Sequence, residues 1–170
     1  DETRSKILIV EDNEELRGLL ARLFSKIYTV YEAQDGEEGF EKTKEVQPDI
    51  VLSDIMMPKM SGIEMCRKIK SNFETSHIPV ILLTAQTAEE YTMQGLKMGA
   101  DDYVTKPFNV KHLFMRCNNL VNSRKLLQQK YAKQMDNNVD ILATNSADYQ
   151  FMEQCVACVE QNLDNPDFDV

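Results

Sequence analysis

The sequence predicts an α/β fold in which helices cover both faces of a five-stranded parallel sheet. Five short apolar runs rich in Val, Ile and Leu alternate regularly with helical patterns. This alternation is typical of strand–helix units joined by right-handed crossovers. The run at residues 6–10 is continuously apolar after Lys6, as expected of a strand that is buried on both faces. Strands are expected at residues 6–10, 28–33, 50–53, 78–83 and 102–105.

Several of the helical patterns begin or end at a residue that favours a helix terminus. Asn13 can cap the first helix, whose apolar residues follow a 3.6-residue period. The Asp35-Gly36 pair leads into a helix around residues 37–46, and Pro48 lies just beyond its end. Further helices are expected from Ser61-Gly62 onward, at about 87–97 and at about 109–121.

The pattern changes after about residue 123. Residues 124–134 are helical and mostly polar, residues 136–145 indicate a linker, and an amphipathic helix is expected from 146 to about 163. Helical spacing also continues from Leu113 to Tyr131, so one long helix from the fifth unit is an alternative. A packed last helix with a flexible tail and a dimerising stalk both remain open.

Composition limits the class of protein. The chain has 42% hydrophobic and 28% charged residues, which is ordinary for a globular protein, and a net charge of −9. The negative charge opposes binding to nucleic acid phosphates or anionic lipid. No run approaches the ~18 apolar residues of a membrane span, and no leader pattern precedes the first strand. The chain runs from Asp1 to Val170 without an initiator Met, which we interpret as an excised fragment.

The cysteine pattern favours a packing role over a metal-binding or redox role. Cys155 and Cys158 form a C-x-x-C within an apolar helical pattern, with no nearby His and no preceding strand. We interpret this pair as buried thiols that act as small hydrophobes. The other two cysteines are Cys66 and Cys117. Reduced thiols fit a cytoplasmic location and leave open a membrane anchor elsewhere in a parent chain.

Polar side chains follow four of the five predicted strands. Glu11 and Asp12 follow the first strand, Asp54 the third, Thr84 the fourth and Lys106 the fifth. In an open parallel sheet, ligands bind beyond the carboxyl ends of the strands. We therefore expect three carboxylates, a hydroxyl and an ammonium group at one rim of the sheet.

This set of groups predicts a metal-assisted phosphoryl acceptor. Three close carboxylates need positive charge, of which Lys106 supplies one, and all-oxygen ligation suits Mg²⁺. Zinc is disfavoured because His77 and His112 fall elsewhere in the pattern. Asp54 is central in the sheet and is the expected nucleophile, with the acids after the first strand as metal ligands. Lys106 and Thr84 would contact phosphoryl oxygens as charge moves.

Four motifs resemble the receiver domain of two-component response regulators. They are residues 7–13 (ILIVEDN), 54–62 (DIMMPKMSG), 83–85 (LTA) and 99–108 (GADDYVTKPF). The resemblance implies a flavodoxin-like (CheY-like) doubly wound sheet with strand order 2-1-3-4-5 and a C-terminal helical extension. It also implies a histidine kinase phosphohistidine as donor, with Asp54 as acceptor.

The resemblance further implies roles for single residues. Mg²⁺, or alternatively Mn²⁺, would be held by Asp12, Asp54 and the Met56 carbonyl, with Glu11 nearby or acting through water. Thr84 would reorient toward the phosphoryl group, and two further features belong to the same pattern: a Tyr103 rotamer change and a cis Lys106-Pro107 peptide. The apolar Met56 predicts a fairly long-lived acyl phosphate.

The tail carries a second resemblance. Residues 146–151 (SADYQF) and 162–170 (NLDNPDFDV) are similar to the start of an AraC-type helix-turn-helix domain. We therefore expect a receiver at 1–123, a helical extension and linker at 124–145, and the start of a truncated DNA-binding domain at 146–170. The implied parent is a hybrid histidine kinase that regulates transcription. DNA would be bound only by the missing part, and a homodimer through the fourth and fifth units or the C-terminal helix stays open.

Three alternative functions share parts of this pattern. A haloacid-dehalogenase-type phosphatase also forms an aspartyl phosphate, but it needs a second Asp where this chain has Met56. A degenerate receiver that serves only as an interaction module is disfavoured by the complete set of acids, Lys106 and Thr84. A free-standing response regulator shares the same core, and only the tail favours the hybrid. Whether the fragment counts as an enzyme stays open, since it would catalyse only its own phosphorylation and dephosphorylation.

Overall fold

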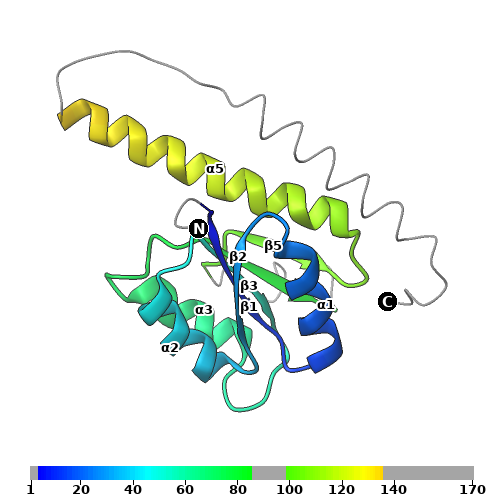
Figure 1. Ribbon diagram of the computed structural model, residues 1–170. Coiled ribbons are helices and arrows are strands. Elements are labelled where there is room, and N and C mark those ends of the chain that lie inside the picture. Colours follow the sequence, from blue (N-terminus) through cyan, green and yellow to red (C-terminus); the bar gives the residue numbers. More distant parts are fainter. Residues whose placement is uncertain (1–3, 86–98, 136–170) are drawn as a thin grey trace.

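The described residues form the parallel sheet that the sequence predicts. The computed structural model describes residues 4–85 and 99–135. Its five strands have the order β2-β1-β3-β4-β5, and every neighbouring pair is parallel (Figure 1). This confirms the doubly wound topology. The strands are β1 (Lys6–Val10), β2 (Thr29–Ala33), β3 (Ile50–Asp54), β4 (Val80–Thr84) and β5 (Asp102–Thr105).

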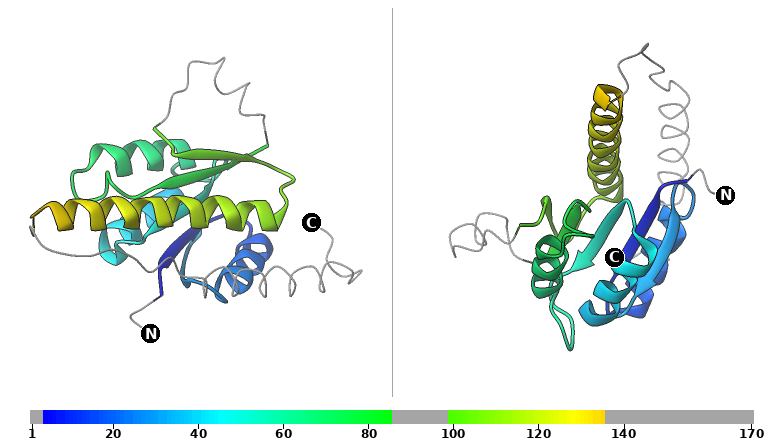
Figure 2. Two further views of the ribbon diagram at one scale, coloured as in Figure 1. Left: turned by 90° about the horizontal axis from the view of Figure 1, so that it is seen from above. Right: turned by 90° about the vertical axis from the view of Figure 1, so that its left-hand side faces the viewer.

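Helices cover both faces of the sheet and divide the core into two layers (Figure 2). Helix α1 (Glu14–Phe24) and helix α5 (Val110–Met135) pack on one face, where Ile7 and Ile9 point. Helix α3 (Gly62–Ser71) packs on the other face, where Leu8 and Val10 point, beside α2 (Gly36–Val46). Alternate residues of β1 therefore enter different layers, which explains why the strand is continuously apolar.

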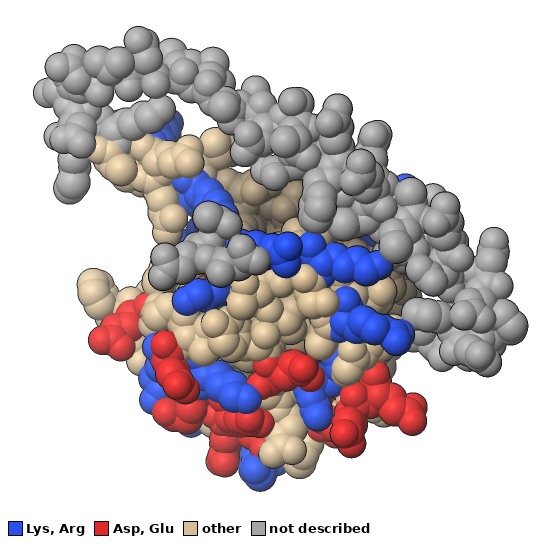
Figure 3. Space-filling view, viewed as in Figure 1, with Lys and Arg blue, Asp and Glu red and all other residues tan. Residues whose placement is uncertain are grey.

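Helix α5 is one continuous helix that crosses the domain boundary predicted after residue 123. Its first half packs on the sheet, whereas Leu126, Leu127 and Tyr131 are 65%, 50% and 66% exposed. The helix contains no Asp or Glu, and in Figure 3 basic side chains lie along it while acidic ones gather at the opposite end of the domain. The net charge is thus unevenly distributed. A homodimer through α5 stays a prediction.

Parts of the sequence prediction lie outside the described residues. They include the helix at about 87–97, the linker, the C-x-x-C pair and the start of the AraC-type domain. In the parts of the chain that the structure does describe, no helix combines the length and the apolar character that crossing a bilayer requires.

Strand β4 begins two residues later than predicted. Pro79 has no N–H group to donate to a neighbouring strand, and the strand starts at Val80. The Pro79 carbonyl still accepts a hydrogen bond from Val51 N–H at 2.9 Å. At the carboxyl ends, Asp54 is the last residue of β3 and Thr84 the last residue of β4. The sequence prediction had ended each strand one residue earlier. Both side chains are therefore held by strand backbone.

The predicted helix starts are confirmed at α1 and α2. The Asn13 side chain accepts a hydrogen bond from Leu16 N–H at 2.9 Å. Asp35 Oδ1 accepts from Glu37 N–H and Glu38 N–H at 3.0 and 2.9 Å. These carboxylate and amide oxygens satisfy N–H groups that have no partner within the helix.

Two of the four cysteines lie in the described part, and both are buried thiols outside any disulfide. Cys66 packs in the α3 layer and Cys117 in the α5 layer. Burial raises the pKa of Cys66 to about 11 and raises that of Cys117 still further. Both thiols therefore stay protonated at neutral pH.

The Tyr28 hydroxyl is buried and has no hydrogen-bond partner among the described residues. We expect Tyr28→Phe to stabilise the domain by about 1 kcal/mol, because it removes a desolvated hydroxyl and keeps the ring contact with Phe24. Urea unfolding measures the change, with the partly exposed Tyr31→Phe as matched control. A loss of more than about 1 kcal/mol for Tyr28→Phe would show that the hydroxyl makes a stabilising hydrogen bond.

The Asp35 carboxylate joins α2 to the loop after β3. Lys59 Nζ lies 2.7 Å from Asp35 Oδ2, and this hydrogen bond, with those from Glu38 and Glu37 N–H, holds the pKa of Asp35 below its usual range. The folded state therefore binds fewer protons, and the pair stabilises the fold above about pH 4 and loses this effect as pH falls through the lowered pKa.

We expect Asp35→Asn to lower the free energy of unfolding by about 1 kcal/mol at pH 7. The difference from wild type should shrink toward zero as the pH approaches 2, since asparagine still caps the helix and lacks only the charge. Urea unfolding at several pH values tests this. Glu41→Gln removes an exposed carboxylate from the same helix and should change stability by less than about 0.5 kcal/mol. A difference that is constant with pH would contradict the account.

Candidate phosphoryl-acceptor site

The predicted acids meet at the carboxyl ends of β1 and β3. The ligand oxygens of Glu11, Asp12 and Asp54 all lie within 4.8 Å of one another. The three residues come from adjacent strands, because β1 pairs directly with β3. Residues that are more than 40 positions apart in sequence are thus brought together by the sheet order alone.

Lys106 contributes an ammonium group to the same cluster. Its Nζ lies 3.2 Å from Glu11 Oε2 and 3.2 Å from Asp54 Oδ1. Lys106 follows β5 at the far side of the rim, and its backbone N–H donates to the Thr84 carbonyl at 2.6 Å. The Lys106-Pro107 peptide is cis, as the resemblance implies. In the described part of the chain, Lys106 therefore pairs with two of the three carboxylates, Glu11 and Asp54.

Asp54 is held firmly from several sides. Its Oδ1 accepts the Ile55 N–H at 2.8 Å in addition to the contact with Lys106. Its backbone carbonyl accepts a hydrogen bond from Ser53 Oγ at 2.8 Å. Among the described residues, the side-chain contacts of Asp54 fall on Oδ1 alone, which leaves Oδ2 for other chemistry.

Glu11 is the most buried acid of the cluster, with 2% of its surface exposed. Its Oε1 accepts the Asn13 N–H at 3.1 Å. Burial and the nearby Asp54 carboxylate raise the pKa of Glu11, although the bonds from Asn13 N–H and Lys106 oppose this. The cluster therefore has too little positive charge for three carboxylates, and a bound cation would favour the ionised forms.

The donor set fits a hard cation. All three side chains offer carboxylate oxygens, which magnesium and manganese prefer, whereas a zinc site would have nitrogen or sulfur ligands. Asp12 is exposed and faces solvent at the open side of the cluster. A partly hydrated ion can reach such a site, and Mg²⁺ keeps several waters when it binds protein.

The remaining predicted residues differ in their strand position and in their exposure. Thr84 is the last residue of β4 and is 1% exposed, so it is buried at the carboxyl end of that strand. Tyr103 lies within β5 opposite Leu82 and packs partly buried on the α3 layer. Met56 lies in the loop after Asp54, with its side chain 76% exposed. Thr84 therefore lies at the strand end of the rim, whereas Tyr103 lies two residues before the end of β5.

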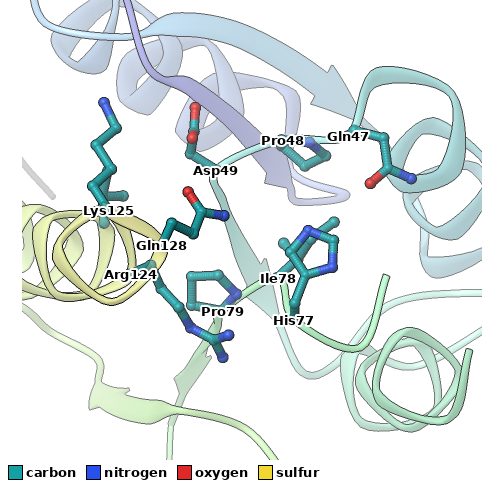
Figure 4. Close-up of a pocket in the computed structure, with 10 residues that line it drawn as sticks. Gln47, Pro48, Asp49, His77, Ile78, Pro79, Arg124, Lys125 and Gln128 are labelled. Carbon is teal, nitrogen blue, oxygen red and sulfur yellow. The ribbon is translucent and has the colours of Figure 1, made fainter. Parts of the chain in front are cut away.

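The two histidines are not part of the acid cluster. His112 is exposed on α5, and His77 lines a hollow of about 200 Å³ at the amino ends of β3 and β4 (Figure 4). Asp49 and Arg124 line the same hollow, at the opposite end of the sheet from Asp54. Among the described residues, neither histidine joins the group of possible metal ligands at the acid cluster, which agrees with the sequence prediction.

Comparison with known proteins decides the family. Residues 7–118 match the family described as the response regulator receiver domain. This chain belongs to that family. The match spans the sheet from the second residue of β1 into α5, so the acid cluster and Lys106 lie within a receiver domain of two-component phosphorelay.

Two curated relatives are histidine kinases by name. The receiver is 37% identical to histidine kinase P4 of Formosa agariphila over all of this chain and 12% of that protein. It is 43% identical to hybrid signal transduction histidine kinase D of Dictyostelium discoideum over 72% of this chain and 8% of that protein. The chain thus spans only a small fraction of the length of these relatives.

Solved receiver structures agree with the fold. The signal receiver domain of a histidine kinase from Syntrophus aciditrophicus is 28% identical, with a TM-score of 0.65 over 82% of this chain and 98% of that one. The chemotaxis response regulator CheY4 of Vibrio cholerae is 28% identical, with a TM-score of 0.64 over 69% of this chain and 99% of that one. The CheY-like fold is therefore established for the receiver.

Sequence reasoning missed two contacts that support the rim. Arg17 donates to the Glu11 carbonyl at 2.8 Å, and Lys59 binds Asp35 from the loop after β3. The helical position of Arg17, one turn after the capping Asn13, is the one signal that could have directed attention to it.

Proposed function

We propose that Asp54 accepts a phosphoryl group from the phosphohistidine of a histidine kinase, in a reaction that requires Mg²⁺ or Mn²⁺. The observation that carries this proposal is the convergence of three carboxylates and the Lys106 ammonium at one rim. Membership of the receiver family supports the same role. Asp54 is the acceptor because it is fixed at the centre of the sheet, between β1 and β4.

The transfer moves one phosphoryl group between two protein side chains. Oδ2 of Asp54 attacks phosphorus and the phosphorus–nitrogen bond breaks. The donor imidazole is the leaving group, and the phosphoryl group becomes an acyl phosphate on Asp54. Oδ2 is assigned because Ile55 N–H and Lys106 both hold Oδ1. Lys106 then neutralises one phosphoryl oxygen, and the Thr84 hydroxyl donates a hydrogen bond to another.

The acidic residues provide the metal site. Asp12, Asp54 and the Met56 carbonyl would hold the ion, with Glu11 nearby or acting through water. When bound, the ion offsets carboxylate repulsion and neutralises charge on the phosphoryl oxygens. Without the ion, the three carboxylates outnumber the nearby positive charge, and this is the physical reason for expecting a bound cation.

Phosphorylation of Asp54 would change the conformation of two residues, Thr84 and Tyr103. Thr84 reorients toward the phosphoryl group, and Tyr103 changes rotamer at the partly buried position that it occupies in β5. The exposed Met56 side chain offers little hydrogen bonding to an attacking water. A long-lived acyl phosphate follows, and a half-life of seconds at neutral pH would contradict this part.

The receiver would act within a longer hybrid chain that carries a histidine kinase and a downstream DNA-binding domain. The names of the two curated relatives and the small share of their length that this chain covers support the kinase part. The AraC-like pattern at 146–170 is the support for the DNA-binding part. The proposed boundaries are 1–123 for the receiver, 124–145 for extension and linker, and 146–170 for the start of the last domain.

Intact mass spectrometry tests the proposal. The 170-residue chain is incubated with Mg²⁺ and acetyl phosphate and should gain the mass of one phosphoryl group, whereas Asp54→Ala should gain none. Asp49→Ala is the matched control, since Asp49 lies just before the other end of β3, 2.7 Å from Lys6 N–H. Equal labelling of Asp54→Ala, or no labelling of wild type, would overturn the proposal. EDTA should abolish labelling.

A further inference from the structure

Arg17 links the site to helix α1 and to strand β2. Its Nη1 donates to the Glu11 backbone carbonyl at 2.8 Å, and its Nε lies 3.4 Å from Glu32 Oε2 on β2. The Arg17 side chain is 18% exposed, so the guanidinium is largely shielded from water. A charged donor in such a place makes a strong hydrogen bond to a carbonyl.

The Glu11 carbonyl belongs to the peptide group that joins Glu11 to Asp12. A hydrogen bond to this oxygen restricts rotation of the peptide plane and thereby sets the direction in which the Asp12 side chain leaves the backbone. On the other side, Asn13 N–H donates to Glu11 Oε1 and Asn13 caps α1. The Arg17 contact therefore fixes the backbone on the strand side of Asp12.

Asp12 depends on this backbone more than the other two acids do. Glu11 and Asp54 are each held through their carboxylates by Lys106 and by a backbone N–H. The described part of the chain gives the Asp12 carboxylate no hydrogen bond and no ion pair. Its position in the acid cluster is therefore determined by its own backbone and rotamer.

We propose that Arg17 is a positioning residue for the metal site: it holds the Glu11–Asp12 peptide so that the Asp12 carboxylate is oriented for a divalent cation. The inference rests on the proposed function. It assigns to Arg17 a role through Asp12, with no contact to the ion or to the phosphoryl group. Groups that orient metal ligands in this way change metal affinity by about 10-fold or more when removed.

The test measures Mg²⁺ binding without phosphorylation. Melting temperatures of the 170-residue chain are recorded over a Mg²⁺ titration, which yields an apparent dissociation constant because the ion stabilises the state that binds it. Arg17→Met should raise this constant by about 10-fold. Arg22→Met, the same substitution at an exposed position further along α1, should leave it unchanged. Glu32→Gln removes only the ion pair and should have a small effect.

A structural role alone would give another pattern. If Arg17→Met lowered the melting temperature in EDTA but kept the wild-type Mg²⁺ constant, the inference would be overturned and the proposed function would stand. If wild type itself showed no response to Mg²⁺, the metal part of the proposed function would fail and the inference with it. In support of the inference, saturating Mg²⁺ should restore the phosphorylation rate of Arg17→Met.

A milder variant guards against misfolding. Arg17→Lys keeps the charge but has a single donor group that must serve both the Glu11 carbonyl and Glu32. It should raise the Mg²⁺ constant by about 3-fold, between wild type and Arg17→Met. If Arg17→Met does not fold, an unchanged constant for Arg17→Lys overturns the inference.

Discussion

Replacing Lys106 with Met should slow phosphorylation of Asp54 by about 100-fold. The Lys106 ammonium group lies 3.2 Å from both Glu11 and Asp54, and no other Lys or Arg of the described residues pairs with either carboxylate. Its loss removes the charge that neutralises a phosphoryl oxygen during transfer. It also leaves the buried Glu11 without a cationic partner.

The rate is measured by intact mass at saturating Mg²⁺ and acetyl phosphate. Lys125→Met is the matched control, because Lys125 lies on α5 and contacts Ser5 Oγ at 2.7 Å, away from the acid cluster. Its rate should equal that of wild type. Should Lys106→Met be phosphorylated as fast as Lys125→Met, the ammonium group would have no part in the transfer.

Gly62→Ala should lower the free energy of unfolding by about 3 kcal/mol. A Cβ atom at Gly62 would lie 2.0 Å from the Asp54 carbonyl oxygen and 3.0 Å from Ser53 Oγ. Neither partner can withdraw easily, because the Asp54 carbonyl belongs to the strand end and already accepts the Ser53 hydroxyl. Helix α3 or the acceptor peptide must move, so the phosphorylation rate should fall as well.

Gly18→Ala is the same substitution at an open position, and we expect it to raise the free energy of unfolding. A Cβ atom at Gly18, within α1, would meet nothing within 4 Å. Alanine favours the helix over glycine, so this variant should gain up to about 1 kcal/mol and keep the wild-type phosphorylation rate. Urea unfolding measures both variants. If the two substitutions had equal effects on stability, the close approach at Gly62 would not constrain the fold.

Much of the fold follows from local pattern. The alternation of short apolar runs with helical patterns predicted the parallel strands, and Asn13 and Asp35 predicted the starts of two helices, which the structure confirms. The strand order came from the resemblance, since hydrophobic period alone does not order strands. The start of β4 was misplaced by two residues because Pro79 is apolar but cannot donate in a sheet.

The acid cluster was predictable because strand ends share one edge of a parallel sheet. Glu11, Asp12, Asp54 and Lys106 are therefore brought together as expected. The supporting contact of Arg17 was not predictable in the same way. It joins a helical side chain to a backbone carbonyl, and such a contact depends on how α1 is placed against β1.

The central claim is that the phosphoryl group resides on Asp54, and peptide mapping after reduction tests it most directly. Borohydride reduces an acyl phosphate to an alcohol, so a phosphorylated Asp becomes homoserine and is located by fragment mass. After treatment with Mg²⁺ and acetyl phosphate, homoserine should appear at position 54 and at no other acidic residue. Homoserine at position 12, or its absence from position 54 in a chain that has gained phosphate, would contradict the account.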